Sequence, residues 1–201
     1  HRVDRRQRQM CIRDSVDYNN DGFLDISMSG LATVNFSTFT ALLLYKWENG
    51  NFVLDDDENQ LSITDGYWGG QYNHDWADYD NDGDLDLVSG GISIFNNTNY
   101  LTIFKNNNGI LSRDTIQTDL IPLFPCALIW IDINGDNYKD LLTLGRFQLN
   151  GVSHMYINDG MGKLIKSSDQ PFEIPSILHA ISVGDHNSDG YDDIALSLIH
   201  I

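Results

Sequence analysis

The chain has 201 residues and a formal net charge of −17 at pH 7. This acidic balance argues against nucleic acid and anionic membrane surfaces as partners, because both are themselves negatively charged. Membrane insertion is not expected either, because the best apolar run, residues 120–131, is short and contains Pro122 and Pro125. A chain of this length can bury a core, so we expect a folded protein.

The two ends of the chain differ in character from the rest. Residues 5–15 resemble the translation of a transposase sequencing adapter, and the final residues resemble the translation of its reverse complement. We therefore expect residues 1–15 and 196–201 to be adapter-derived, and residues 16–195 to be an internal fragment of a longer gene. Cys126 is then the only cysteine of the fragment, which excludes an internal disulfide.

Four acidic loops with the pattern D-x-[DN]-x-D-[GN]-x-x-D recur at intervals of 53 to 61 residues. They read DYNNDGFLD over residues 17–25, DYDNDGDLD over 78–86, DINGDNYKD over 132–140 and DHNSDGYDD over 185–193. Positions 1, 3, 5 and 9 supply side-chain oxygens, and position 7 supplies a carbonyl, which together suit a hard divalent cation. The pattern predicts four calcium sites, with calcium as the cofactor.

The backbone must bend sharply at position 6 of each loop, and the residue types found there allow such a bend. Position 6 is glycine in three loops and Asn137 in the third, and asparagine is the next most tolerant residue of a left-handed backbone. An EF-hand begins with the same residues but needs a glutamate at position 12 and flanking helices. Position 12 is Met28, Ser89, Thr143 or Leu196, and short β-rich segments follow each loop, which excludes an EF-hand.

Further landmarks recur between the loops. Asn49-Gly50, Asn108-Gly109 and Asp159-Gly160 predict tight hairpin turns, because both turn positions tolerate positive φ. An apolar residue lies two positions before the second, third and fourth loops, which predicts a strand leading into each of them. About four strands per repeat is the content of one β-propeller blade, so we expect an all-β, four-stranded antiparallel propeller with about three blades and the start of a fourth.

With these loops and strands, the chain resembles the FG-GAP/VCBS repeats of calcium-binding β-propellers, including the integrin α head. The segment WADYDNDGDLDLVSGG, from Trp76, is particularly similar. The resemblance spans residues 16–195, with repeats starting near residues 17, 78, 132 and 185. It implies calcium binding, but such repeats occur in proteins with many different functions.

The resemblance implies side-chain ligands at positions 1, 3, 5 and 9 and a carbonyl ligand at position 7. These residues are Asp17, Asn19, Asp21, Phe23 and Asp25; Asp78, Asp80, Asp82, Asp84 and Asp86; Asp132, Asn134, Asp136, Tyr138 and Asp140; and Asp185, Asn187, Asp189, Tyr191 and Asp193. The second loop alone has four carboxylates among its side-chain ligands, so its composition predicts the tightest binding.

Two other features of the sequence have a functional and a structural interpretation. Aromatic residues precede the second loop (Tyr67, Trp68, Tyr72 and Trp76), and they could stack on a sugar ring or pack in a core. His74-Asp75 could take part in acid–base chemistry, but no nucleophile or oxyanion feature accompanies it, which favours a structural role.

The leading functional hypothesis is a non-catalytic, calcium-stabilised segment of a larger protein that binds proteins or glycans. We expect an extracellular or cell-surface location, because loops of this kind suit millimolar calcium. The remaining blades would then lie outside the fragment. The alternatives are the propeller of a secreted enzyme, of the polysaccharide lyase or phospholipase type, and a toxin-associated scaffold.

Overall fold

The computed structural model describes residues 12–34, 37–55, 73–92, 98–123, 126–147, 150–168, 178–190 and 192–198. All regular structure in these residues is β-strand, as the sequence predicts. Within the same residues, no helix has the length and apolar character needed to cross a membrane.

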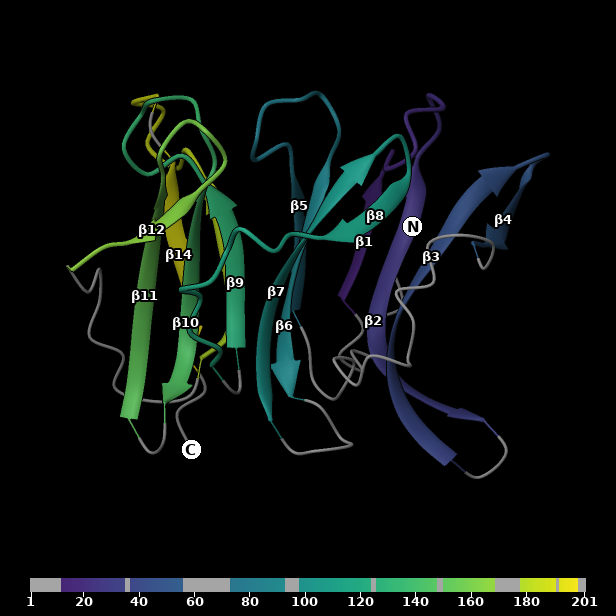
Figure 1. The fold of residues 1–201 in the computed structure, drawn as a ribbon, viewed down its shortest axis with the longest axis horizontal. Coiled ribbons are helices and arrows are strands. Elements are labelled where there is room, and N and C mark those ends of the chain that lie inside the picture. Colours follow the sequence, from purple (N-terminus) through teal and green to yellow (C-terminus); the bar gives the residue numbers. More distant parts are fainter. Residues whose placement is uncertain are drawn as a thin grey trace.

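Three four-stranded antiparallel sheets and one two-stranded sheet follow one another along the chain (Figure 1). The first sheet contains β1 (Ile12–Val16), β2 (Asp25–Val34), β3 (Ser37–Glu48) and β4 (Asn51–Leu54). The second contains β5 (Asn73–Ala77), β6 (Asp86–Ile92), β7 (Asn99–Asn107) and β8 (Ile110–Arg113). The third contains β9 (Cys126–Ile131), β10 (Asp140–Phe147), β11 (Asn150–Asn158) and β12 (Leu164–Lys166). The fourth pairs β13 (Leu178–Gly184) with β14 (Asp193–Leu198).

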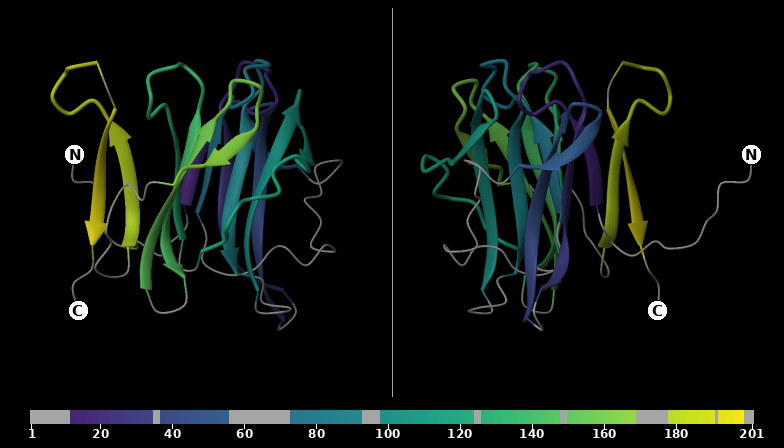
Figure 2. Two further views of the ribbon diagram at one scale, coloured as in Figure 1. Left: turned by 60° about the vertical axis from the view of Figure 1, so that its left-hand side comes forward. Right: turned by 90° about the vertical axis from the view of Figure 1, so that its right-hand side faces the viewer.

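The strands of each four-stranded sheet are ordered as they occur in the sequence, and the first strands of successive sheets are neighbours. β5 contacts both β1 and β9, and β9 in turn contacts β13. Figure 2 shows the β13–β14 hairpin at one end of the row of sheets. The predicted strands that lead into the second, third and fourth loops are therefore confirmed as β5, β9 and β13.

The hydrophobic core lies between the sheets. The second and third sheets share one cluster, in which the Tyr79 and Trp130 rings stack with centroids 5.3 Å apart. On β10, Leu141 belongs to this cluster, whereas Leu142 belongs to the cluster between the third and fourth sheets. Successive residues of a strand point to opposite faces, so the sheet buries both of its faces. Stacking of sheets thus fixes the position of each loop relative to the neighbouring repeat.

Two sequence predictions, the turn at Asp159-Gly160 and the adapter-derived ends, concern residues at the strand boundaries. The hairpin at Asp159-Gly160 is longer than the predicted tight turn, because residues 159–163 separate β11 from β12 and the Asp159 N–H donates to the Lys163 carbonyl at 3.0 Å. The proposed adapter segments overlap β1 and β14, which begin at Ile12 and end at Leu198. Strand pairing uses backbone groups that every non-proline residue has, so the adapter origin of these ends stays a prediction.

Candidate functional site

All four acidic loops connect the first two strands of their sheets and lie at the same end of the molecule (Figure 1). In each sheet, the last residue of the first strand pairs with the aspartate at loop position 9. The four pairs are Val16 with Asp25, Ala77 with Asp86, Ile131 with Asp140 and Gly184 with Asp193. The loops are therefore equivalent in register as well as in sequence.

The aspartate at position 1 holds each loop closed through two backbone N–H groups. In the second loop, the N–H groups of Asp82 and Gly83 donate to the two carboxylate oxygens of Asp78, both at 3.0 Å. The same pair of bonds joins residues 21 and 22 to Asp17, residues 136 and 137 to Asp132, and residues 189 and 190 to Asp185. The turn conformation is thus fixed by the carboxylate that is also a predicted ligand.

Two positions of every loop have positive φ, although the sequence predicts only one. Position 6 is left-handed as expected, and Asn137 adopts a φ of 68° where the other loops have glycine. Position 4 is left-handed as well, with Asn20, Asn81, Gly135 or Ser188 at a φ between 58° and 77°. The third loop thus places glycine at position 4 and asparagine at position 6, and both residue types tolerate this backbone.

The aspartate at position 9 is buried in the first three loops, and its carboxylate accepts backbone N–H groups from its own loop or from the third strand of its sheet. Asp86 accepts the N–H of Asn106 on β7 at 2.8 Å and the N–H of Tyr79 at 3.3 Å. Asp140 accepts the equivalent bonds from Asn158 and Ile133, at 2.8 and 3.0 Å. Burial raises the pKa of Asp86 to about 7, although the bond from Asn106 acts in the opposite direction. These N–H donors offset part of the cost of a buried carboxylate.

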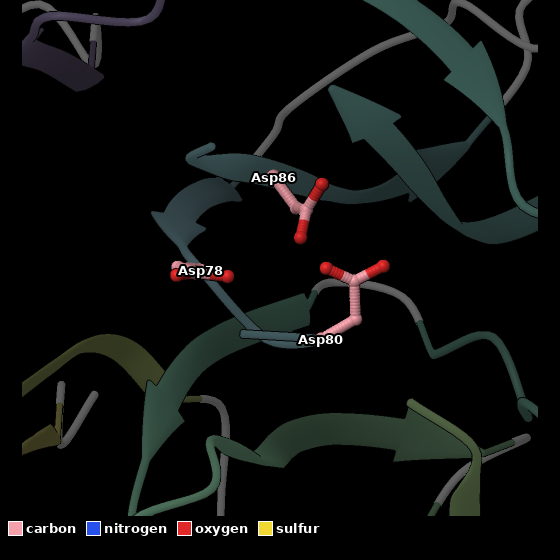
Figure 3. Close-up of side chains that lie close together, drawn as sticks. All are labelled: Asp78, Asp80 and Asp86. Carbon is pink, nitrogen blue, oxygen red and sulfur yellow. The ribbon is translucent and has the colours of Figure 1, made fainter. Parts of the chain in front are cut away.

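The second loop brings three of its predicted ligands together. Asp78, Asp80 and Asp86 each place a carboxylate oxygen within 4.8 Å of the others, and their side chains converge in Figure 3. Asp80 Oδ1 is buried without a hydrogen-bond partner among the described residues. Oxygen donors with one unsatisfied buried oxygen fit a hard divalent cation, because such a cation supplies the missing positive charge.

The remaining predicted ligands have defined partners or lie outside the described part. The structure does not include Asp82 in the converging group, and its Oδ1 accepts the Asp84 N–H at 2.9 Å. Phe23 and Tyr138, at position 7, likewise donate their N–H groups to the position 5 carboxylates of their loops. Tyr191 lies outside the described residues.

Asparagines on the third strands of the second and third sheets join the first and second loops to the next sheet, and sequence reasoning did not identify them. The Asn106 amide donates to the Tyr18 carbonyl of the first loop at 2.7 Å and to the Leu85 carbonyl at 2.9 Å. Asn158 repeats this arrangement one sheet later, with the Tyr79 and Lys139 carbonyls. The sequence signal that could have identified them is an asparagine shortly before the turn glycine in two repeats, Asn106 before Gly109 and Asn158 before Gly160.

A buried tyrosine–carboxylate pair supports the first and second loops. Tyr79 at position 2 donates its hydroxyl to Asp114 at 2.7 Å, and Tyr18 donates to Asp55 in the same way. Burial and the adjacent carboxylate raise the pKa of both tyrosines, so both remain protonated donors. The third repeat has Ile133 in place of the tyrosine. It has Ser167 in place of the aspartate, because the Ser167 N–H makes the backbone bond that Asp55 and Asp114 make in their repeats, so both partners change together.

His74 and Asp75 lie between sheets. Both His74 ring nitrogens hydrogen bond to hydroxyls of the first sheet, Ser27 at 2.9 Å and Ser29 at 3.0 Å. The Asp75 carboxylate accepts the backbone N–H of Trp130, on the third sheet, at 2.7 Å. Burial lowers the pKa of His74 to about 4, so the ring is neutral near pH 7. These contacts favour the structural interpretation.

Trp76 is the one member of the aromatic group within the described residues, and it also joins two sheets. Its ring lies 6.0 Å from that of Tyr18, and its Nε1 donates to Ser27 at 3.0 Å. Tyr67, Trp68 and Tyr72 lie outside the described part. Trp76 is therefore a packing residue between the first two sheets.

Comparison with known proteins identifies the repeat and the fold. Residues 132–196 match the family model of the FG-GAP-like repeat, which confirms the family expected from the sequence over those residues. No curated protein matches the chain. Among solved structures, the chain is similar to a lectin of Agrocybe aegerita, whose structure is described as the basis of specific recognition of non-reducing terminal N-acetylglucosamine.

The likeness to the lectin is one of fold. The TM-score is 0.53 at 17% sequence identity, and the match covers 92% of this chain. It covers 59% of the lectin chain, so this chain spans less than two thirds of the length of that relative.

Proposed function

We propose that the chain is a segment of a β-propeller in which calcium-binding loops fix the geometry of the blades. Each four-stranded antiparallel sheet has the strand content of one blade. The adjacency of β1, β5, β9 and β13 supports a common axis lined by the first strands. On this proposal the chain holds three blades, and β13 and β14 begin a fourth.

Calcium is the cation we propose for the four loops. Its ligands would be the side-chain oxygens at positions 1, 3, 5 and 9 and the carbonyl at position 7. The observation that carries this proposal is the convergence of Asp78, Asp80 and Asp86, one of which, Asp80, has a buried oxygen without a hydrogen-bond partner among the described residues. A cation beside these carboxylates offsets their mutual repulsion and the burial cost of Asp86.

The role we propose for the whole protein is ligand binding outside the cell, with glycans as the favoured ligand class. The FG-GAP-like repeat and the lectin fold support a binding module, and calcium loops of extracellular modules are weak enough to need millimolar calcium. The ligand surface would be formed by loops on the rigid sheets, where binding residues concentrate.

We further propose that the described part of the chain performs no catalysis. His74 is the residue most suggestive of acid–base chemistry, and it is only 3% exposed. Its contacts with Ser27 and Ser29 place it between the first and second sheets, where both ring nitrogens have hydrogen-bond partners.

A glycan array tests the proposed role. The chain should be applied with millimolar calcium and again with a chelator, on arrays that include glycans with terminal N-acetylglucosamine. We expect calcium-dependent retention on a subset of glycans, and reduced retention for Asp78→Asn. Binding to none of them by folded, calcium-loaded chain would contradict glycan recognition, and turnover of an array polysaccharide would instead support an enzyme.

A further inference from the structure

Lys105 on β7 contacts one of the converging carboxylates of the second loop. Its ammonium nitrogen lies 2.7 Å from Asp80 Oδ2, and it also lies 5.6 Å from the centre of the Tyr79 ring. The Asp80 side chain is 13% exposed and the Lys105 side chain 34% exposed, so the ion pair is partly shielded from solvent. Such a pair is screened less than one on an open surface.

The second carboxylate oxygen of Asp80 is not used by the lysine. Asp80 Oδ1 is buried without a partner among the described residues, while Oδ2 binds the lysine. The carboxylate can therefore contact Lys105 and a cation in the loop at the same time. The two positive groups would then be separated by a single carboxylate.

The lysine and the extra carboxylate occur in the same repeat. Position 3 is Asp80 in the second loop and asparagine in the others, namely Asn19, Asn134 and Asn187. Asn106, the residue after Lys105, donates its N–H to the position 9 aspartate, as Trp47 and Asn158 do in their sheets. The equivalents of Lys105 are therefore Lys46 and Ile157.

These equivalent residues have different surroundings. Lys46 lies 3.7 Å from Asp55, which is not a loop residue. Ile157 carries no charge. Lys105 thus balances a charge that only the second loop has, and the Asp80–Lys105 pair carries the same net charge as an asparagine at position 3.

We propose that Lys105 sets the calcium affinity of the second loop by acting as a tethered cation at Asp80. This inference rests on the proposed function, because it assumes that the loops bind calcium. The affinity of the second loop then falls to that of the loops with three carboxylates, although its composition alone predicts the tightest binding. For charges of +1 and +2 about 6 Å apart in a medium with the dielectric constant of water, the repulsion weakens binding roughly tenfold.

Calcium titration of the full chain, followed by the backbone amide signals of the loop glycines, measures each loop separately. The Gly83 N–H bonds to Asp78 and reports on the second loop, and the Gly22 N–H bonds to Asp17 and reports on the first. The variants are Lys105→Met, which removes the charge, and Lys105→Gln, which keeps a hydrogen-bond donor. Lys46→Met is the matched control, because that lysine pairs with Asp55.

Both Lys105 variants should lower the calcium Kd reported by Gly83 about tenfold and leave that reported by Gly22 unchanged. Lys46→Met should leave the Kd at Gly83 as in the wild type. An unchanged or higher Kd at Gly83 in both Lys105 variants would overturn the proposal, and a higher one would make Lys105 a positioning residue for Asp80. If no glycine signal saturates with millimolar calcium in any of the proteins, the proposed function itself fails, which is a different result.

Discussion

Asn106→Ala tests whether the asparagines of the third strands hold neighbouring repeats together. Asn106 is 2% exposed, and its amide donates to the carbonyls of Tyr18 in the first loop and Leu85 in the second. Its side-chain oxygen accepts the Gly109 N–H at 2.8 Å. Alanine removes all three hydrogen bonds and leaves three backbone groups without these partners.

The expected cost follows from these three bonds. A buried hydrogen bond contributes about 1 kcal/mol net, and a partner left unsatisfied costs about 1 to 3 kcal/mol, so we expect a loss of about 3 kcal/mol. For a chain of this size, that loss lowers the Tm by roughly 6 to 12 °C.

Denaturant unfolding, followed by intrinsic fluorescence at fixed calcium concentration, measures this loss. Asn107→Ala is the matched control, because Asn107 is the adjacent residue of β7 and is exposed. We expect the control to stay within about 0.5 kcal/mol of the wild type. A loss below about 1 kcal/mol for Asn106→Ala would refute the reasoning that Asn106 joins the repeats.

Two further predictions concern buried groups between sheets and between repeats. Burial lowers the pKa of His74 from 6.5 to about 4, so between these pH values the unfolded chain binds a proton that the folded chain does not. The free energy of unfolding is therefore unaffected by His74 above pH 6.5 and decreases as the pH falls toward 4. Over that window the loss is about 3 kcal/mol, and His74→Gln should flatten this part of the stability–pH curve; an equally steep curve in the variant would assign the loss to other groups. A Cβ at Gly162 would lie 3.1 Å from the Asp80 Cβ at a φ of +79°, whereas Gly50 has a φ of +83° with nothing within 4 Å. Gly162→Ala should therefore lower the free energy of unfolding more than Gly50→Ala, which adds only left-handed strain of about 1 to 2 kcal/mol; equal losses would show that the approach to Asp80 is unimportant.

The loops and most strands could be predicted because their determinants are local. The spacing of Asp78 and Asp86, for example, fixes one turn and the strand that follows it, and both agree with the structure. Asn108-Gly109 likewise forms the short connection between β7 and β8, with positive φ at both residues. The Asp159-Gly160 turn was less predictable, because Gly162 adds a further left-handed residue to that connection.

Contacts between distant strands and between sheets could not be predicted in this way. Lys105 on β7 meets Asp80 in the loop between β5 and β6 of the same sheet, whereas the Asn106 amide reaches Tyr18 of the first repeat across 88 residues of sequence. Neither strand periodicity nor loop spacing contains that information, because the first contact depends on how strands pair within a sheet and the second on how sheets stack. A count of the charges on residues 78–86 alone therefore omitted Lys105, whose ammonium group lies beside Asp80.

Calorimetric titration of the full chain with calcium tests the central claim of this account most directly. Four equivalent loops predict saturable binding of about four calcium ions per chain in the range that extracellular modules show, with Kd values of roughly 10⁻⁴ to 10⁻³ M. Asp78→Asn should remove about one of these ions, because Asp78 is both a ligand and the residue that closes the second loop. The absence of saturable binding at millimolar calcium, in protein shown to be folded, would contradict the account.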